Sequence, residues 1–218
     1  LDELAYKTPT PIQVQAIPPI LKGRDVMGAA QTGTGKTAAF ALPILQRMLP
    51  FESTSTSPAR HPIRALILAP TRELADQIAL SVQRYAQHTH LRSAVIFGGM
   101  DMRPQVEILR NGVEILIATP GRLLDHVQAK SINLSTVQSL VLDEADRMLD
   151  MGFLPDLQRI VNLCPKQRQT LLFSATFSPE IRKLAVSFQH NPISVEVARS
   201  NATADTVVQT AFSVEQAH

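Results

Sequence analysis

The sequence predicts an α/β fold built on a mainly parallel β-sheet with helices on both faces. Short runs of aliphatic and β-branched residues recur along the 218 residues, and amphipathic segments separate them. Such alternation builds parallel βαβ units, whose strands are buried on both faces and therefore apolar almost throughout. Hydrophobic residues make up 44% of the chain and charged residues 18%, so a sizeable core can form.

Seven segments have the composition of buried strands. In chain order they are 25–28, 64–68, 94–97, 114–118, 139–142, 170–173 and a weaker one at 193–197. Helical spacing of apolar residues predicts helices over 72–87 and 179–188, and the polar stretch 52–58 predicts a flexible loop. Ligands of such sheets bind beyond the carboxyl ends of the strands, so the residues after each strand are the first candidates for function.

Composition and charge narrow the possible classes of protein. The net charge of +2 permits nucleic-acid binding without requiring it. The single cysteine, Cys164, excludes an internal disulfide and a cysteine-rich zinc site. Five histidines lack the spacing of metal ligands, so no histidine metal site is expected; they are His61, His88, His90, His126 and His190. No apolar run reaches membrane-spanning length and no signal peptide is evident, which predicts a cytoplasmic protein with no membrane partner.

The segment 30–37, AQTGTGKT, follows the first predicted strand and has the pattern of a phosphate loop. Gly33 and Gly35 let the backbone turn its N–H groups toward phosphate oxygens. Lys36 brings a positive charge to the β- and γ-phosphates, and the Thr37 hydroxyl is suited to hold magnesium. Ala30 replaces the usual first glycine, which adds only a methyl group. The predicted nucleotide-binding residues here are Gln31, Thr32, Gly33, Thr34, Gly35, Lys36 and Thr37.

The acidic string Asp143-Glu144-Ala145-Asp146 directly follows the strand 139–142. Alone, such a string is typical of a solvated helix start. After a buried strand, and together with a phosphate loop, it predicts that Asp143 orients a magnesium ion. Glu144 is then expected to orient an attacking water or to accept its proton. The predicted catalytic residues are therefore Lys36, Asp143 and Glu144, and the predicted metal ligands are Thr37 and Asp143.

These strings, in this order, resemble the first RecA-like domain of a DEAD-box RNA helicase, with bacterial RhlE-type members the most similar. The resemblance implies a RecA-like P-loop NTPase domain over residues 1–205, with residues 206–218 beginning a linker to a second domain. The segment 6–13 resembles the Q motif, in which Tyr6 stacks on adenine and Gln13 reads its edge. The segment 174–176 resembles the SAT motif, which implies that Ser174, Thr176 and Asp146 couple hydrolysis to RNA.

Three further strings resemble the elements with which this family grips single-stranded RNA. They are Pro70-Thr71-Arg72, Gly98-Gly99 and Thr119-Pro120-Gly121-Arg122. Glycine N–H groups, threonine hydroxyls and helix N-termini contact a nucleic-acid backbone without reading its sequence. The two arginines would add an attraction that weakens with salt.

The expected function is that of the ATP-binding domain of an RNA-dependent ATPase. It would use ATP and magnesium, hydrolyse ATP to ADP and phosphate, and locally unwind or remodel RNA duplexes. An ATP-gated RNA clamp or scaffold that does not unwind uses the same motifs and stays open as an alternative. A DNA-directed motor is disfavoured by Gln13 and by the DEAD string.

A second RecA-like domain in cis is the expected partner besides single-stranded or duplex RNA. In the family it supplies arginine fingers, which are worth about 10³–10⁵ in rate. These 218 residues alone are therefore expected to bind nucleotide and to hydrolyse it very slowly.

Overall fold

The computed structural model describes residues 7–197. Seven strands form one sheet in the order β3-β4-β2-β5-β6-β1-β7, and every pair of neighbours is parallel. The strands are β1 (Val26–Ala29), β2 (Ala65–Leu68), β3 (Ser93–Ile96), β4 (Ile115–Ala118), β5 (Ser139–Leu142), β6 (Gln169–Ser174) and β7 (Ile193–Glu196). The predicted fold class is confirmed, and the sheet is wholly parallel where a mainly parallel one was expected.

Eight α-helices connect these strands within the described residues. They are α1 (Pro11–Leu21), α2 (Lys36–Met48), α3 (Arg72–Ala86), α4 (Met102–Arg110), α5 (Pro120–Gln128), α6 (Ala145–Asp150), α7 (Leu154–Leu163) and α8 (Pro179–Phe188). Side-chain oxygens cap three of them, because Thr71, Asp101 and Ser178 accept backbone N–H groups of the first turn. No described helix has the length and apolar character needed to cross a membrane.

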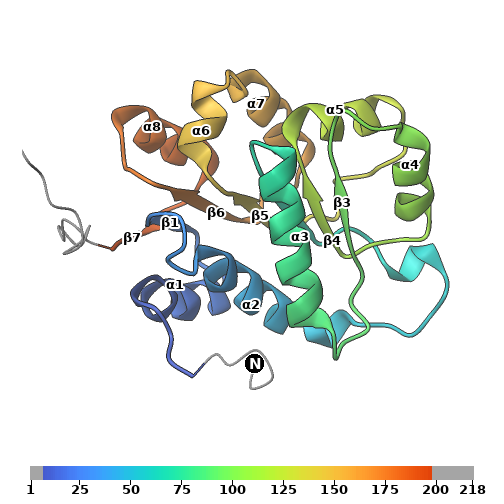
Figure 1. Ribbon diagram of the computed structural model, residues 1–218, viewed down its shortest axis with the longest axis horizontal. Coiled ribbons are helices and arrows are strands. Elements are labelled where there is room, and N and C mark those ends of the chain that lie inside the picture. Colours follow the sequence, from blue (N-terminus) through green and yellow to red (C-terminus); the bar gives the residue numbers. More distant parts are fainter. Residues whose placement is uncertain (1–6, 198–218) are drawn as a thin grey trace, which may run out of the picture.

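The helices form two layers, with α1, α2 and α3 on one face of the sheet and α4 to α8 on the other (Figure 1). Alternate residues of each strand supply the two faces. In β2, for example, Ile67 packs with the first layer, whereas Leu66 and Leu68 pack with the second. The sheet is therefore the middle layer of a three-layer fold with two cores.

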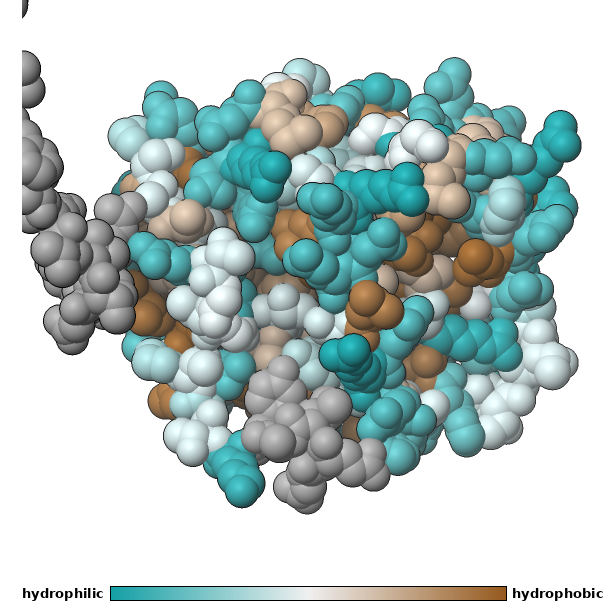
Figure 2. Space-filling model, in the orientation of Figure 1, coloured by the Kyte–Doolittle hydropathy of each residue, from teal (hydrophilic) through white to brown (hydrophobic). Residues whose placement is uncertain are grey.

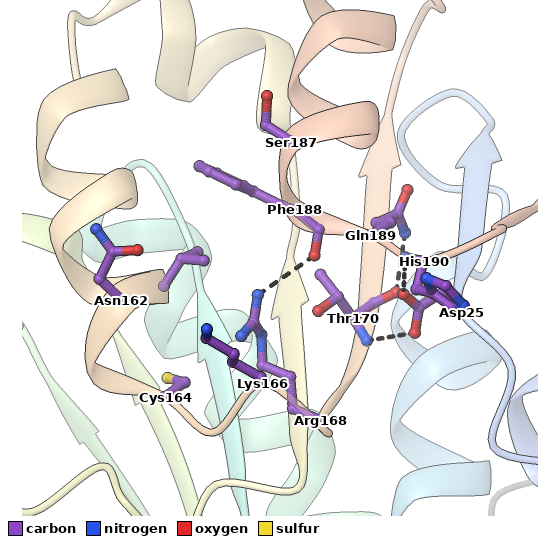
Figure 3. Close-up of a pocket in the computed structure, with 11 residues that line it drawn as sticks. Asp25, Asn162, Cys164, Lys166, Arg168, Thr170, Ser187, Phe188, Gln189 and His190 are labelled. Atoms are coloured by element: carbon purple, nitrogen blue, oxygen red, sulfur yellow. Dashed lines mark hydrogen bonds between the residues drawn. The ribbon is translucent and has the colours of Figure 1, made fainter.

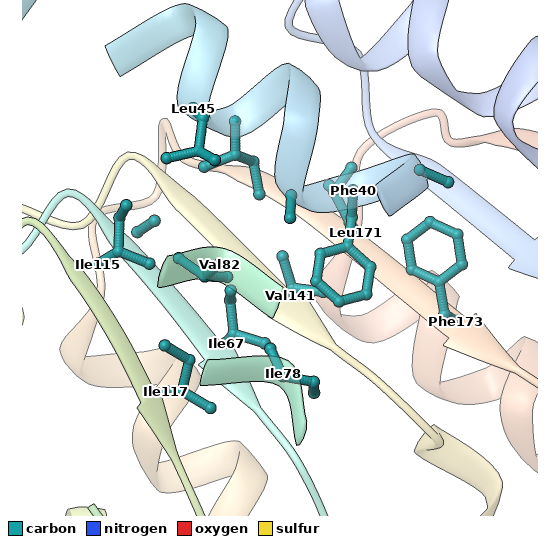
Figure 4. Close-up of a cluster of buried hydrophobic side chains, with 14 of the residues drawn as sticks. Phe40, Leu45, Ile67, Ile78, Val82, Ile115, Ile117, Val141, Leu171 and Phe173 are labelled. Atoms are coloured by element: carbon teal, nitrogen blue, oxygen red, sulfur yellow. The ribbon is translucent and has the colours of Figure 1, made fainter. Parts of the chain in front are cut away.

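The core under α2 and α3 is built from aliphatic side chains and the rings of Phe40, Phe97 and Phe173, and Figure 4 labels the first and last of these rings. Phe40 of α2 and Phe173 of β6 are both fully buried, and their ring centroids lie 5.5 Å apart. The ring of Phe173 also fills the space beside Gly28, where a Cβ would come within 2.7 Å of it. This packing fixes the strand that leads into the phosphate loop.

Three expectations differ from the structure or lie outside it. The stretch 52–58 is a loop, as predicted, but it is pinned, because His61 Nε2 and Arg92 Nη2 both bond the Ser55 carbonyl, at 2.7 and 2.8 Å. Tyr6 lies outside the described residues, as do the predicted domain end at 205 and the linker 206–218.

The visible surface is largely hydrophilic, with small separate groups of hydrophobic residues (Figure 2).

Candidate nucleotide and nucleic-acid sites

The strand order sorts the predicted site residues into two halves of one sheet edge. The phosphate loop, the acidic string and the SAT string follow β1, β5 and β6, which are adjacent in the order β5-β6-β1. The three strings predicted to grip RNA follow β2, β3 and β4, which are adjacent in the order β3-β4-β2. Because all strands are parallel, every string emerges at the carboxyl edge. The two halves meet between β2 and β5, where the Asp143 N–H donates to the Leu68 carbonyl at 3.0 Å.

The phosphate loop turns on two glycines with left-handed backbones. Gly33 has φ +81° and Gly35 has φ +87°, a region that residues with a side chain adopt at a cost. A Cβ on Gly35 would also lie 2.5 Å from Gln13 Nε2. Helix α2 begins directly afterwards at Lys36, so its N-terminus and the preceding N–H groups form a cradle suited to an anion.

Gln13 lies against the phosphate loop. Its side chain is 5% exposed, its Oε1 accepts the Thr10 N–H at 2.9 Å, and its Nε2 donates to the Gly35 carbonyl at 3.2 Å. The amide keeps one hydrogen and one lone pair for other partners. Its predicted role of reading adenine stays a prediction, and its contact with Gly35 adds a direct link between α1 and the phosphate cradle.

Lys36 and Asp143 face a cavity of about 390 Å³ that the phosphate loop, α3 and the acidic string enclose. Lys36 is 8% exposed and Asp143 is 2% exposed. Among the described residues, neither has an ion-pair partner within 4 Å. Burial raises the pKa of Asp143 to about 6, against the opposing influence of the Lys36 charge and the Glu144 N–H bond. Burying the charged form of Asp143 costs free energy, and a cation that binds together with a nucleotide would offset that cost.

The donor set fits magnesium better than a metal held by protein ligands alone. Described residues contain no group of three or more His, Cys, Asp or Glu that could hold a metal ion. Magnesium is usually bound through one or two carboxylates, phosphate oxygens and water. Asp143 and the Thr37 hydroxyl line the same cavity and supply the protein's share of such a shell.

Glu144 has an unusual backbone conformation. Its φ is +51°, a left-handed value that is rare outside glycine, at the residue that begins α6. Its carboxylate lines the cavity and lies 3.6 Å from the Arg147 guanidinium. Strain of this kind costs of order 1–3 kcal/mol and concentrates at functional sites. The backbone thus aims the Glu144 side chain into the cavity that holds Lys36.

The acidic string contacts the SAT string directly. Asp146 Oδ2 accepts the Ala175 N–H at 3.1 Å, and the Ser174 carbonyl accepts the Ala30 N–H at 3.1 Å. The Ser174 hydroxyl is buried with no hydrogen-bond partner among the described residues. The segment 174–176 therefore bridges the start of the phosphate loop and the acidic string, which is the arrangement that a coupling role requires.

In the other half of the edge, two arginines face the strings predicted to bind RNA. The Arg72 guanidinium lies 4.7 Å from the centre of the Phe97 ring, just before Gly98-Gly99. Arg122 Nη2 donates to the Met100 carbonyl at 3.0 Å, which ties α5 to the same glycine loop. Its Nε lies 3.3 Å from Asp125, and Nε and Nη1 are buried without a hydrogen bond in the described part of the chain. The Arg122 side chain is 11% exposed, so only its remaining surface is open to a phosphate.

Sequence patterns missed the wall that α3 contributes to the nucleotide cavity. Leu74, Gln77, Ser81 and Tyr85 line it, each about one turn after the last. The helix was predicted from the apolar spacing of Leu74, Ile78 and Val82, and the face beside that stripe was given no role. Its residues recur three and four apart, which was the available signal.

A second cavity, of about 300 Å³, lies at the opposite, amino edge of β1 and β6 (Figure 3). Two of its charged groups, Asp25 and Arg168, are bonded within the fold. Asp25 accepts the N–H groups of Thr170 and His190 at 2.8 and 2.6 Å. Arg168 donates to the carbonyls of Pro165 and Phe188, which lie just beyond α7 and at the end of α8. This cavity is thus part of the scaffold, where a cation stabilises helix C-termini.

Comparison with known proteins shows which family has the same sequence features. The family model described as DEAD/DEAH box helicase matches residues 10–184. The chain is 47% identical over 204 residues to an ATP-dependent RNA helicase, CshA, of Limosilactobacillus reuteri. It is 46% identical over 209 residues to the ATP-dependent rRNA helicase rrp3 of Schizosaccharomyces pombe. It covers 39% and 43% of these relatives, and they cover 94% and 95% of it.

Solved structures agree with this. The yeast DEAD-box splicing factor Prp28 superposes with a TM-score of 0.84 at 36% identity, covering 90% of this chain and 47% of that one. A DEAD box protein from Methanococcus jannaschii gives a TM-score of 0.80 at 38% identity, covering 89% of this chain and 51% of that one.

Proposed function

The chain belongs to the DEAD/DEAH box helicase family, and we propose that it is the nucleotide-binding RecA-like domain of an ATP-dependent RNA helicase. The whole protein would hydrolyse ATP to ADP and phosphate, and would couple this to binding and local opening of RNA. ATP, magnesium and single-stranded RNA are its proposed ligands. The proposal rests on the similarity of the chain to RNA helicases and on the geometry of the carboxyl edge.

The main support for the proposal is that the carboxyl edge of the sheet has one half suited to a nucleotide and one half suited to RNA. The half built on β5, β6 and β1 holds the phosphate cradle and a buried carboxylate. The half built on β3, β4 and β2 holds an arginine, Arg122, that bonds the Met100 carbonyl, and a loop with a left-handed glycine, Gly99. A simple nucleotide hydrolase needs only the first half.

Each residue of the nucleotide half has a proposed role. Lys36 and the N–H groups before α2 hold the phosphates, and Gln13 holds the loop from behind through Gly35. Magnesium, when bound, would neutralise charge on the phosphate oxygens, and Asp143 and Thr37 would hold it. Glu144 orients the attacking water and accepts its proton. Asp146, Ser174 and Thr176 would couple hydrolysis to RNA, and the Asp146–Ala175 bond joins the acidic and SAT strings within the nucleotide half.

We also propose that a second RecA-like domain in cis completes the site. The chain spans about two fifths of the length of the relatives it matches, and less than two thirds of each solved structure. Nothing in the described cavity supplies a second cation to a γ-phosphate, since Lys36 is its one lysine or arginine. A rate-raising arginine from another domain would fill that need.

The direct test is ATP hydrolysis by the full-length protein with and without nucleic acid. We expect single-stranded RNA to stimulate hydrolysis, and matched single-stranded DNA to stimulate it much less. Strand separation of a short RNA duplex, measured in parallel, distinguishes a helicase from a clamp. Hydrolysis that ignores RNA would contradict the proposal.

A further inference from the structure

Two buried polar side chains lie behind the half of the edge assigned to RNA. His126 of α5 is 0% exposed and Gln105 of α4 is 7% exposed. Neither belongs to a string that resembles a family motif, and neither lines the nucleotide cavity. Burying polar groups costs free energy unless they are paired, so their arrangement calls for an explanation.

These side chains form a chain of hydrogen bonds between the glycine loop and helix α5. Gln105 Nε2 donates to the Phe97 carbonyl at 3.1 Å, directly before Gly98-Gly99. Gln105 Oε1 lies 3.3 Å from His126 Nε2, and His126 Nδ1 lies 2.7 Å from the Ser131 hydroxyl. The chain therefore runs from the glycine loop, through α4, to α5, whose first turn holds Pro120, Gly121 and Arg122.

The hydrogen-bonding partners of His126 determine whether its Nε2 carries a hydrogen. The Phe97 carbonyl can only accept, so the Gln105 amide nitrogen faces it and the amide oxygen faces His126. Nε2 of His126 therefore carries a hydrogen, and in the neutral ring Nδ1 can only accept. The Ser131 hydroxyl lies 2.7 Å from Nδ1 and 3.1 Å from the His126 carbonyl, and its single hydrogen can serve only one of them. Burial first, and then the charge of Arg122, lower the pKa of His126, opposed by Asp125, and this favours the neutral ring.

The same chain is linked through neighbouring groups to both arginines assigned to RNA. Arg122 lies one turn before His126 on α5, and its Nη2 bonds the Met100 carbonyl. Phe97, whose carbonyl receives the Gln105 bond, presents its ring to the Arg72 guanidinium. A shift of the Gln105–His126 pair would thus move the glycine loop, Arg72 and Arg122 relative to one another.

We propose that Gln105 and His126 are positioning residues that hold the three RNA-facing strings in one register, so that one RNA backbone can contact all of them. They touch no ligand themselves. This inference rests on the proposed function, because it concerns the RNA half of that site. It goes beyond that function in assigning RNA affinity to two buried residues outside every matching string.

The test compares variants that break or keep the chain in the full-length protein. His126→Leu removes the ring nitrogens, Gln105→Met removes both amide partners, and His126→Gln keeps an N–H donor toward Gln105. The probe is a fluorescent single-stranded oligouridylate, titrated with a nonhydrolysable ATP analogue present. Affinity for the nucleotide alone is measured on the same samples.

We expect His126→Leu and Gln105→Met to weaken RNA binding by between about 2-fold and 30-fold, the range typical of residues that act through others. His126→Gln should recover most of that loss. Nucleotide affinity should stay at the wild-type value in all three variants. A general loss of folded protein would lower the binding amplitude, but it would not separate RNA affinity from nucleotide affinity.

His61→Leu is the matched control, because His61 is also buried with both ring nitrogens bonded, and it lies at the amino edge. It should lower the melting temperature and leave RNA affinity unchanged. Equal RNA affinity of His126→Leu and wild type, failure of His126→Gln to recover, or an equal RNA loss in His61→Leu would overturn the inference. Absence of RNA binding by the wild type would instead overturn the proposed function.

Discussion

The amino and carboxyl edges of the sheet differ in how completely their buried polar groups are paired. At the amino edge, Glu114 bonds His61 Nδ1 at 2.5 Å and the Arg92 N–H at 2.8 Å, and Gln169 bonds the carbonyls of Ile20 and Arg24. At the carboxyl edge, the Ser174 hydroxyl has no partner among the described residues, and Asp143 has no cation within 4 Å.

Some unpaired atoms also occur at the amino edge, where Arg64 Nε has no hydrogen-bond partner among the described residues and its guanidinium lies 4.5 Å from the centre of the Phe51 ring. Two others belong to groups that are otherwise bonded. Arg168 Nε is unpaired while both its other nitrogens donate, and Gln189 Oε1 is unpaired while its Nε2 donates twice. The difference teaches that most buried polar groups of the amino edge are bonded within the fold, whereas the carboxyl edge holds a carboxylate and a hydroxyl with no such partner among the described residues. Four predictions, in order of decreasing effect, test this difference.

Glu144→Gln should have the largest effect, and only on catalysis. Removing the base should lower RNA-stimulated hydrolysis by about 10²–10⁴-fold while the nucleotide still binds. Steady-state hydrolysis by the full-length protein and nucleotide titration measure the two quantities. Glu107→Gln, which alters an exposed carboxylate on α4, is the control and should hydrolyse at the wild-type rate. A Glu144→Gln variant with near-normal turnover would remove Glu144 from its proposed role.

Glu114→Ala should have the opposite profile. It leaves His61 Nδ1 and the Arg92 N–H buried without an acceptor, so the free energy of unfolding should fall by about 3–5 kcal/mol. Urea unfolding measures this loss. Nucleotide affinity of the molecules that remain folded should not change. If nucleotide affinity fell as much as stability, the two edges would not be independent.

Substituting alanine for one left-handed glycine at each edge compares how much stability the backbone loses there. At Gly112 a Cβ would lie 2.8 Å from His61 Cβ and 2.9 Å from the Pro58 carbonyl, whereas at Gly33 it meets nothing within 4 Å. We expect Gly112→Ala to cost about 2–4 kcal/mol of stability and Gly33→Ala about 1–2 kcal/mol. Equal losses in thermal unfolding would show that the crowding at Gly112 does not matter.

Asp143→Asn should stabilise the nucleotide-free protein while it abolishes activity. The pKa of Asp143 in the folded protein, about 6, lies above the ordinary 3.8, so protonation of Asp143 stabilises the folded state. This stabilisation is fully present at pH values below 3.8. That contribution disappears as the pH rises through the folded pKa. At pH 7 the variant should therefore gain about 1–3 kcal/mol. The gain should shrink toward about pH 5, and a gain independent of pH would contradict the burial argument.

Local patterns in the sequence predicted most of the fold and the main strings of the site. All seven strands were found to within about two residues, because strands buried on both faces are continuously apolar, as Leu66-Ile67-Leu68 shows. The strand order was not predicted, because it depends on long-range pairing. That order places the strings after β1, β5 and β6 together.

Contacts between distant segments were the part that sequence could not supply. His61 and His126 were set aside because they lack metal-ligand spacing, yet both are buried and bonded, to Glu114 and to Gln105. The signal available was a charged residue, Glu114, at the start of an apolar strand. The strain at Glu144 was equally invisible, since a left-handed backbone at a carboxylate has no sequence pattern.

The most direct test compares two lysines, one at each edge. Lys36 faces the carboxyl-edge cavity and Lys166 lines the amino-edge cavity. Titration of the full-length protein with a fluorescent ATP analogue and magnesium should show that Lys36→Ala binds about 10- to 100-fold more weakly, while Lys166→Ala binds as the wild type does. Unchanged affinity in Lys36→Ala, or an equal loss in Lys166→Ala, would contradict the assignment of the carboxyl edge to nucleotide.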